Sequence, residues 1–244
     1  MSCATDFLAG TDPVFKECTE GIATLSRIVV ACPQALAGQA RASLVPALYA
    51  YWERFFRITF AEFLRCISEA NIPFANICSA LARFKVRKHA LLLDSSHRAR
   101  ILHTIDNRSL TDTKAFLQEI LNEMNDIDRA FGQPVVFFDP SAWIETDSNV
   151  RYEVVEKVCR NVGVDPEALK QILSASKIAL YPRLKELVDM RNDIAHGTTI
   201  APLGQSKWDE LQSFVSTLMN AVQLLLYETL ANGQHLAPTA SVPP

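Results

Sequence analysis

Three polar residues near the end of the sequence could perform phosphate-ester chemistry. Arg191, Asn192 and His196 all lie in the segment MRNDIAHG. An imidazole has a reference pKa of about 6.5, so His196 could accept or donate a proton near neutral pH. The Arg191 guanidinium stays charged at every accessible pH and can hold a phosphate through two parallel hydrogen bonds. The segment therefore combines a proton-transfer group with a permanent positive charge.

A helix over residues 177–196 must position these groups. Arg191 falls near the centre of an arc of apolar residues on this helix, formed by Leu180, Leu184, Leu187, Val188, Ile194 and Ala195. A guanidinium there needs an anionic partner, because an unpaired buried charge is strongly destabilising. Asn192 and His196 are four residues apart, so they lie on the same side of the helix. Gly197 predicts that the helix ends at His196.

Structural roles for the same residues must also be considered. Arg191 could form an internal salt bridge with a carboxylate such as Glu53, and His196 could be only a helix-capping residue. Glu53 lies among the aromatic residues of YWERFF, which favours a structural role. Asp193 is a supporting candidate, although its predicted direction lies off the side that Asn192 and His196 share.

The rest of the sequence predicts an all-α fold. Eight glycines and twelve prolines in 244 residues punctuate long stretches of helix-forming residues, and strand patterns are nearly absent. We expect one domain over residues 1–236 and a disordered tail over 237–244. We expect helices near residues 12–30, 34–70, 73–88, 95–105, 112–130, 150–161, 177–196 and 205–232, with a short one from Pro166. Residues 131–150 should form an irregular connection, with VVFF extended against the helices, and Ser148 or Asn149 should cap the next helix.

A net charge of -3 excludes a protein that is basic overall, so contacts with nucleic acid must be local. One basic segment covers residues 83–103 and predicts an RNA-binding patch of Arg83, Lys85, Arg87, Lys88, Arg98 and Arg100. A solvated pair of helices is an equal alternative for this segment.

Other classes of function lack their motifs. The six cysteines never form C-x-x-C, which favours packed, reduced thiols over a zinc site or a disulfide framework. The acidic segment from Glu119 to Arg129 has the spacing of a solvated helix face, and we assign no metal and no cofactor. Phosphate-binding glycine loops and a serine nucleophile motif are absent. Neither a secretory signal nor an 18-residue apolar span is evident, so we expect a cytoplasmic protein.

The residues from Arg191 to Gly197, written RNDIAHG on a late helix of an all-α chain, resemble the signature of the HEPN superfamily. LYAYWERFF and SNVRYEVVEKVCRNVG extend the resemblance to prokaryotic HEPN-like nucleases of toxin-antitoxin and antiphage loci, including the RiboL-PSP-associated type. The resemblance covers about residues 41–232. The section between Phe74 and Ala130 departs from it.

The resemblance implies a helical bundle with additional helices, which dimerises so that two copies of the late helix share a cleft. It also implies a metal-independent endoribonuclease that leaves 2',3'-cyclic phosphate and 5'-hydroxyl ends. Arg191 and His196 would be catalytic, and Asn192 would position them or the phosphate. Such a protein would be a toxin or defence effector controlled by an antitoxin or another regulatory protein. The alternative is a catalytically silent module that binds RNA, nucleotide or a protein.

Overall fold

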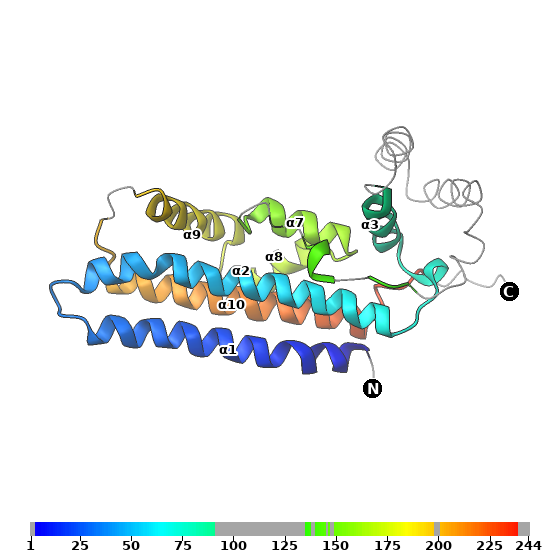
Figure 1. The fold of residues 1–244 in the computed structure, drawn as a ribbon, viewed down its shortest axis with the longest axis horizontal. Coiled ribbons are helices and arrows are strands. Elements are labelled where there is room, and N and C mark those ends of the chain that lie inside the picture. Colours follow the sequence, from blue (N-terminus) through cyan, green and yellow to red (C-terminus); the bar gives the residue numbers. More distant parts are fainter. Residues whose placement is uncertain are drawn as a thin grey trace.

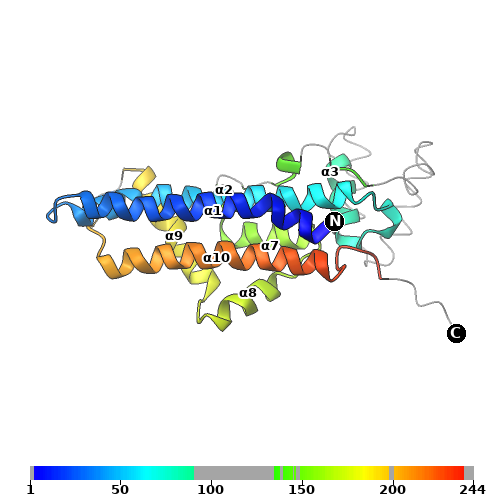
Figure 2. The same ribbon diagram turned by 90° about the horizontal axis from the view of Figure 1, so that it is seen from below.

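Three long amphipathic helices form the body of the protein. The structure, a computed structural model, describes residues 3–90, 135–137, 140–144, 146, 149–197 and 201–238. Helices α1 (Cys3–Ala31), α2 (Ala37–Glu69) and α10 (Gln205–Ala231) pack against one another along their lengths. Figures 1 and 2 show that α2 and α10 run in the same direction, while α1 runs opposite to both.

Helix α1 begins earlier than the sequence predicted. Proline at position 13 indicated the first helical turn, but the helix starts at Cys3 and contains Pro13 in its interior. The apolar face that includes Cys18 and Ile22 continues backwards through Phe7 and Ala4, which are buried. Burial of these residues compensates for the hydrogen bond that Pro13 cannot donate.

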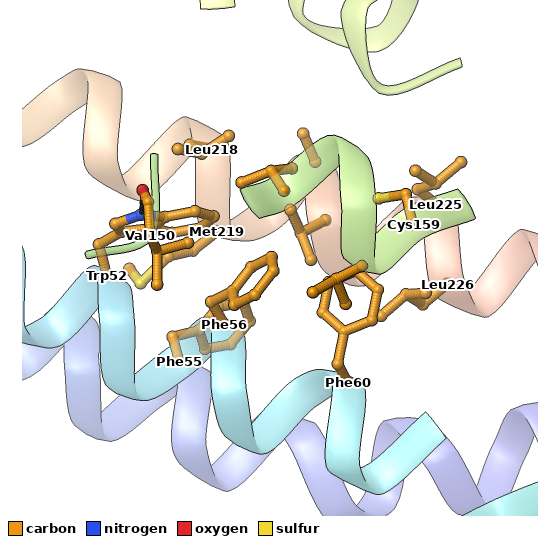
Figure 3. Close-up of a cluster of buried hydrophobic side chains, with 14 of the residues drawn as sticks. Trp52, Phe55, Phe56, Phe60, Val150, Cys159, Leu218, Met219, Leu225 and Leu226 are labelled. Atoms are coloured by element: carbon orange, nitrogen blue, oxygen red, sulfur yellow. Dashed lines mark hydrogen bonds between the residues drawn. The ribbon is translucent and has the colours of Figure 1, made fainter. Parts of the chain in front are cut away.

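The core is built on aromatic residues of α2. Trp52, Phe56 and Phe60 are fully buried and in sequential contact, with ring centroids 5.3 Å and 4.7 Å apart. Figure 3 shows these rings facing the aliphatic side chains of α10 and the helix that contains Cys159. Such a stripe of large side chains, repeated at helical spacing, fixes α2 as the central element.

Shorter helices cover α2 and α10 on the side away from α1 (Figure 1). They are α3 (Ser79–Ala90), α7 (Tyr152–Asn161), α8 (Pro166–Ala175) and α9 (Leu180–Ala195), with single turns of 3-10 helix at Phe74–Asn76 and Pro140–Trp143. The described residues thus contain seven α-helices and no β-strand, which confirms the all-α prediction.

Several helix ends lie where the sequence placed them. The Asp165 side chain accepts a hydrogen bond from the Glu167 amide at the start of α8. Gly163, Gly197 and Gly233 follow the ends of α7, α9 and α10 with φ values of +80°, +73° and +66°. These left-handed conformations are the usual way in which a glycine ends a helix.

Two predicted helix starts are wrong. Pro73 precedes only a 3-10 turn, because the chain then becomes extended and pairs with the C-terminal segment: the Cys78 amide donates to the His235 carbonyl at 2.8 Å. Helix α7 follows Arg151 without a side-chain cap, so Asn149 does not cap it. The reason is that α2 binds the backbone of Val150, which delays the helix; Ser148 lies outside the described residues.

The expected extended connection is confirmed for Val135–Phe137. Val135 and Phe137 are buried, and their amides donate to the Ile72 carbonyl and to Ser68 Oγ, at 2.8 and 2.9 Å. At the other end of the chain, the Ala237 amide donates to the Asn76 carbonyl at 2.7 Å, so the bonded backbone reaches the first residue of the predicted tail. The helices expected at 95–105 and 112–130 lie outside the described residues.

We expected no segment apolar enough to span a membrane, but α10 is such a segment by its length and composition. Among the described helices it alone is long and apolar enough to do so, by length and composition. However, 61% of its most apolar stretch is buried against the rest of the protein. This burial is typical of a core helix, because α10 packs against both α1 and α2.

Candidate functional site

The Arg191 side chain is held by neutral groups. Its Nη1 donates to Asn192 Oδ1 at 2.9 Å, and its guanidinium carbon lies 5.4 Å from the centre of the Tyr49 ring. Across the described part of the chain, no carboxylate lies within 4.0 Å of it, so the salt bridge considered for Glu53 is not formed. This half-buried guanidinium is thus oriented by an aromatic ring and an amide, and no carboxylate of the described residues forms an ion pair with it.

The Arg191 guanidinium lies over the ring of Tyr49, which forms the platform for this side chain. The Tyr49 side chain is 1% exposed, and its hydroxyl oxygen accepts a hydrogen bond from the Val150 amide at 2.6 Å. Trp52, one turn further along α2, donates from Nε1 to the Val150 carbonyl at 3.3 Å. Burial raises the pKa of Tyr49 to about 12, so the ring stays neutral across the physiological range. The platform is therefore fixed both in position and in charge.

His196 caps the C-terminus of α9 and is exposed. Its backbone amide donates to the Asn192 carbonyl at 2.9 Å, and Gly197 ends the helix. The imidazole has no side-chain hydrogen bond within the described residues, so it does not contact the Asn192 amide as the spacing allowed.

The connection after His196 returns to the start of α2. Arg41 donates from Nε to the Leu203 carbonyl at 2.6 Å and from Nη1 to Gln205 Oε1 at 2.9 Å. The Leu203 amide donates to the Gly38 carbonyl at 3.0 Å. These bonds anchor the chain just beyond the helix end that carries His196.

The two supporting candidates, Glu53 and Asp193, line two different hollows. Glu53 is half-buried and lines a hollow of about 400 Å³ beside Arg54, Arg57 and Ser141. It still interacts with Tyr49, where its negative charge adds to the effect of burial in raising the tyrosine pKa. Asp193 is exposed and lines a separate hollow along α9, of about 590 Å³. Neither carboxylate forms an ion pair with Arg191, although Glu53 and Arg191 both act on Tyr49.

The predicted basic patch is only partly brought together. Arg83 and Arg87 line one hollow, whereas Lys85 points elsewhere: its Nζ donates to the Val136 carbonyl at 2.9 Å and lies 5.6 Å from the centre of the Phe137 ring. Burial lowers the pKa of Lys85. Lys88 belongs to α3, but its side chain is not among those described, and Arg98 and Arg100 lie outside the described residues.

Sequence reasoning missed two residues. Tyr49 was counted with the aromatic core, and its position at the N-terminal end of the stripe, three residues before Trp52, was the available signal. Arg160 was overlooked because α7 carries acids as well as bases. In the structure it joins Arg83 and Arg87.

The described residues contain no group of three or more His, Cys, Asp or Glu side chains that could hold a metal ion. All six cysteines are free thiols, and Cys18, Cys66 and Cys159 are buried.

A bundle of long helices, with an arginine and a histidine at the end of a late helix, defines the HEPN class, whose members are generally ribonucleases. The chain belongs to the RiboL-PSP-HEPN family, whose model matches residues 26–228. This range begins earlier than the resemblance read from the sequence and includes α2 through most of α10. Comparisons with curated proteins and with solved structures give no match.

Proposed function

We propose that the protein is a metal-independent endoribonuclease that works as a homodimer. The observation that carries this proposal is the setting of Arg191: Tyr49 and Asn192 orient its guanidinium, and it forms no ion pair with a carboxylate of the described residues. His196 is exposed at the end of the same helix. An oriented cation without such an ion pair is suited to a phosphodiester, which also supplies the anionic partner that this position requires.

The proposed reaction uses the nucleophile that RNA carries. His196 removes the proton of the 2'-hydroxyl, the 2'-oxygen bonds to phosphorus, and the bond from phosphorus to the 5'-oxygen breaks. The departing oxygen takes a proton from the His196 imidazole of the second subunit. Arg191 stabilises the extra negative charge on the phosphorane. The products are a 2',3'-cyclic phosphate and a 5'-hydroxyl, and DNA is resistant because it lacks the nucleophile.

Two copies are needed because one chain presents one imidazole at this site. His196 is exposed at the C-terminus of α9, where a second α9 would approach it. A dimer would supply an acid and a base together, as well as two guanidiniums for one phosphate. A strict monomer by mass measurement in solution would count against this arrangement.

The decisive experiment is cleavage of mixed RNA in EDTA by the wild type, His196→Ala and Arg191→Ala. Loss of the acid–base group should cost His196→Ala about 100- to 10,000-fold in rate, and loss of a charge-stabilising donor should cost Arg191→Ala about 100- to 1,000-fold. Arg183→Ala is a matched control, because Arg183 lies on the same helix but pairs with Glu186 and Glu210. It should cleave like the wild type, and an RNA with 2'-deoxy sugars should stay intact.

Two results would exclude the proposed ribonuclease activity at this site. Either the wild type does not cleave RNA, or both site variants cleave it as fast as the wild type. A catalytically silent module remains the second candidate, and the lack of any side-chain partner for His196 in the described residues favours it. Such a module would bind RNA, nucleotide or a protein through Arg191 without cutting. We further propose a cytoplasmic role as a toxin or antiphage effector, restrained by an antitoxin or another regulatory protein.

A further inference from the structure

Two cysteine side chains meet where the start of α1 lies beside the end of α2 (Figures 1 and 2). Cys3 is the first residue of α1, and Cys66 lies in the last turn of α2. The Cys66 thiol donates a hydrogen bond to the Cys3 sulfur, and neither residue is in a disulfide. Because the two sulfurs are already in contact, rotation of the side chains would bring them to bonding distance without moving either helix.

The register of α1 against α2 places these two residues opposite each other. The helices are antiparallel, and three pairs of residues in contact mark their register: Gly21 with Tyr51, Glu17 with Arg54, and Gly10 with Glu62. Each step toward the start of α1 matches a step of similar length toward the end of α2, so Cys3 falls opposite the last turn of α2. The contact between the two thiols is therefore a result of how the long helices pack.

The two thiols have different surroundings. Cys66 is 3% exposed; Arg65 Nη2 donates to its sulfur at 3.6 Å, and Glu62 Oε1 lies 3.9 Å from it. Cys3 is half-buried, so a small oxidant can reach it. The hydrogen bond from Cys66 lowers the pKa of Cys3, and the same bond, together with burial, raises the pKa of Cys66. Since the thiolate is the reactive form of cysteine, Cys3 is the thiol that an oxidant attacks first.

We propose that Cys3 and Cys66 are a redox modification site, which hydrogen peroxide converts into a reversible disulfide. The Cys3 thiolate attacks one oxygen of the peroxide: an S–O bond forms, the O–O bond breaks, and the departing hydroxide takes a proton from solvent to become water. Cys3 is then a sulfenic acid. The Cys66 sulfur attacks the Cys3 sulfur, the S–O bond breaks, and hydroxide leaves as water with the Cys66 proton. Two electrons pass from the two thiols to the peroxide, which is reduced to two water molecules.

The disulfide would stabilise the fold under oxidising conditions. It ties the free end of α1 to α2 and closes a loop that contains both helices, and a long closed loop strongly restricts the unfolded chain. Along α2, Cys66 and Tyr49 are about 25 Å apart at a rise of about 1.5 Å per residue. The modification therefore acts on the scaffold and not on the candidate site, and the inference does not depend on the proposed function.

The test maps the oxidised cysteines in the full chain. The reduced protein is treated with increasing hydrogen peroxide, the remaining thiols are blocked with N-ethylmaleimide, and the unreduced peptides are analysed by mass spectrometry. We expect the peptides of Cys3 and Cys66 to be joined within one chain, with a mass lower by two hydrogen atoms, and dithiothreitol should restore both thiols. Oxidation of other cysteines while this pair stays reduced would overturn the proposal, as would a bond formed only between chains.

Variants separate the roles of the two thiols. In Cys66→Ala, the Cys3 sulfenic acid has no second thiol to react with, so dimedone should trap it. In Cys3→Ser, no sulfenic acid should form at Cys66. The control is Cys32→Ser, which removes a half-buried thiol just after the other end of α1 and should form the disulfide as the wild type does. Circular dichroism verifies that each variant is folded, and dimedone trapped at Cys66 instead of Cys3 would contradict the proposed order of steps.

Thermal unfolding measures the effect on the scaffold. The oxidised wild type should melt at least about 5 °C above the reduced protein, because the disulfide closes a long loop. Peroxide should leave the melting temperature of Cys3→Ser unchanged. An equal rise in Cys3→Ser would show that another oxidation is responsible, and an oxidised wild type that melts like the reduced protein would refute the stabilising role.

Discussion

Replacing Asn192 with aspartate tests directly whether the positive charge of Arg191 contributes to RNA binding. The Asn192 side chain accepts a hydrogen bond from Arg191 Nη1 at 2.9 Å. Asn192→Asp has almost the same shape, so it puts a carboxylate where the amide oxygen lies. The guanidinium then has an internal anion, and an RNA phosphate must compete with it.

The expected effect follows from the change in that hydrogen bond. The wild-type bond already has a charged donor, so the substitution adds only the attraction of a full negative charge, from about 1 kcal/mol in open solvent to at most about 4 kcal/mol near a protein surface. The variant therefore stabilises the unliganded arrangement by at least about 1 kcal/mol relative to the wild type. RNA binding loses the same amount, which corresponds to at least about fivefold in affinity. Stability to unfolding should rise slightly or stay the same.

The assay compares Asn192→Asp with Asn192→Ala in RNA binding, in cleavage and in thermal unfolding. Asn192→Ala removes the hydrogen bond without adding charge, so it should bind RNA within about threefold of the wild type. The aspartate variant should be clearly weaker than the alanine variant, although it is the more stable of the two. Equal affinities for both variants would refute the reasoning, because the charge of Arg191 would then play no part.

Three further predictions concern the scaffold. Tyr49→Phe leaves the buried Val150 amide without an acceptor, so it should lower the free energy of unfolding by about 1–3 kcal/mol, as measured by denaturant titration. Burial lowers the pKa of His235, so the unfolded chain binds more protons below about pH 6.5 and stability should fall between about pH 7 and pH 5.5; His235→Gln should lose this dependence. Gly163→Ala should destabilise by about 1–3 kcal/mol, because φ is +80° and the new Cβ would lie 2.6 Å from Cys78 Sγ; an unchanged melting temperature would contradict this.

The periodicity of apolar residues predicted most of the helices, because the faces that it marks as apolar are the faces that pack in the core. The aromatic stripe of α2 and the glycines after α7, α9 and α10 each carry their signal within a few residues. The errors occur where distant segments decide the outcome. Val150 is extended because two α2 side chains bind its backbone, and residues after Pro73 are extended because they pair with the C-terminal segment. Local sequence patterns do not predict these contacts, because the residues that form them are far apart in the chain.

In the candidate site, too, some features follow from the local sequence and others depend on contacts with distant residues. The positions of Arg191 and His196 on one helix follow from their spacing, and so does the helix end at Gly197. The partner of Arg191 does not follow: the sequence suggested an internal carboxylate such as Glu53, and the aromatic ring of Tyr49 was not anticipated. Tyr49 lies 142 residues earlier in the chain, and only the packing of α9 on α2 brings the two together.

The position of α1 has a consequence for how the site responds to different substrates. Helix α2 is covered by α1 on one side and by α9 on the other (Figure 1), so Tyr49 and Arg191 belong to a packed framework. His196 occupies a helix end with solvent around it and a glycine after it. In the proposed ribonuclease, His196 should therefore adjust its position to RNAs of differing shape. Arg191 should hold the phosphate at the same position in each case.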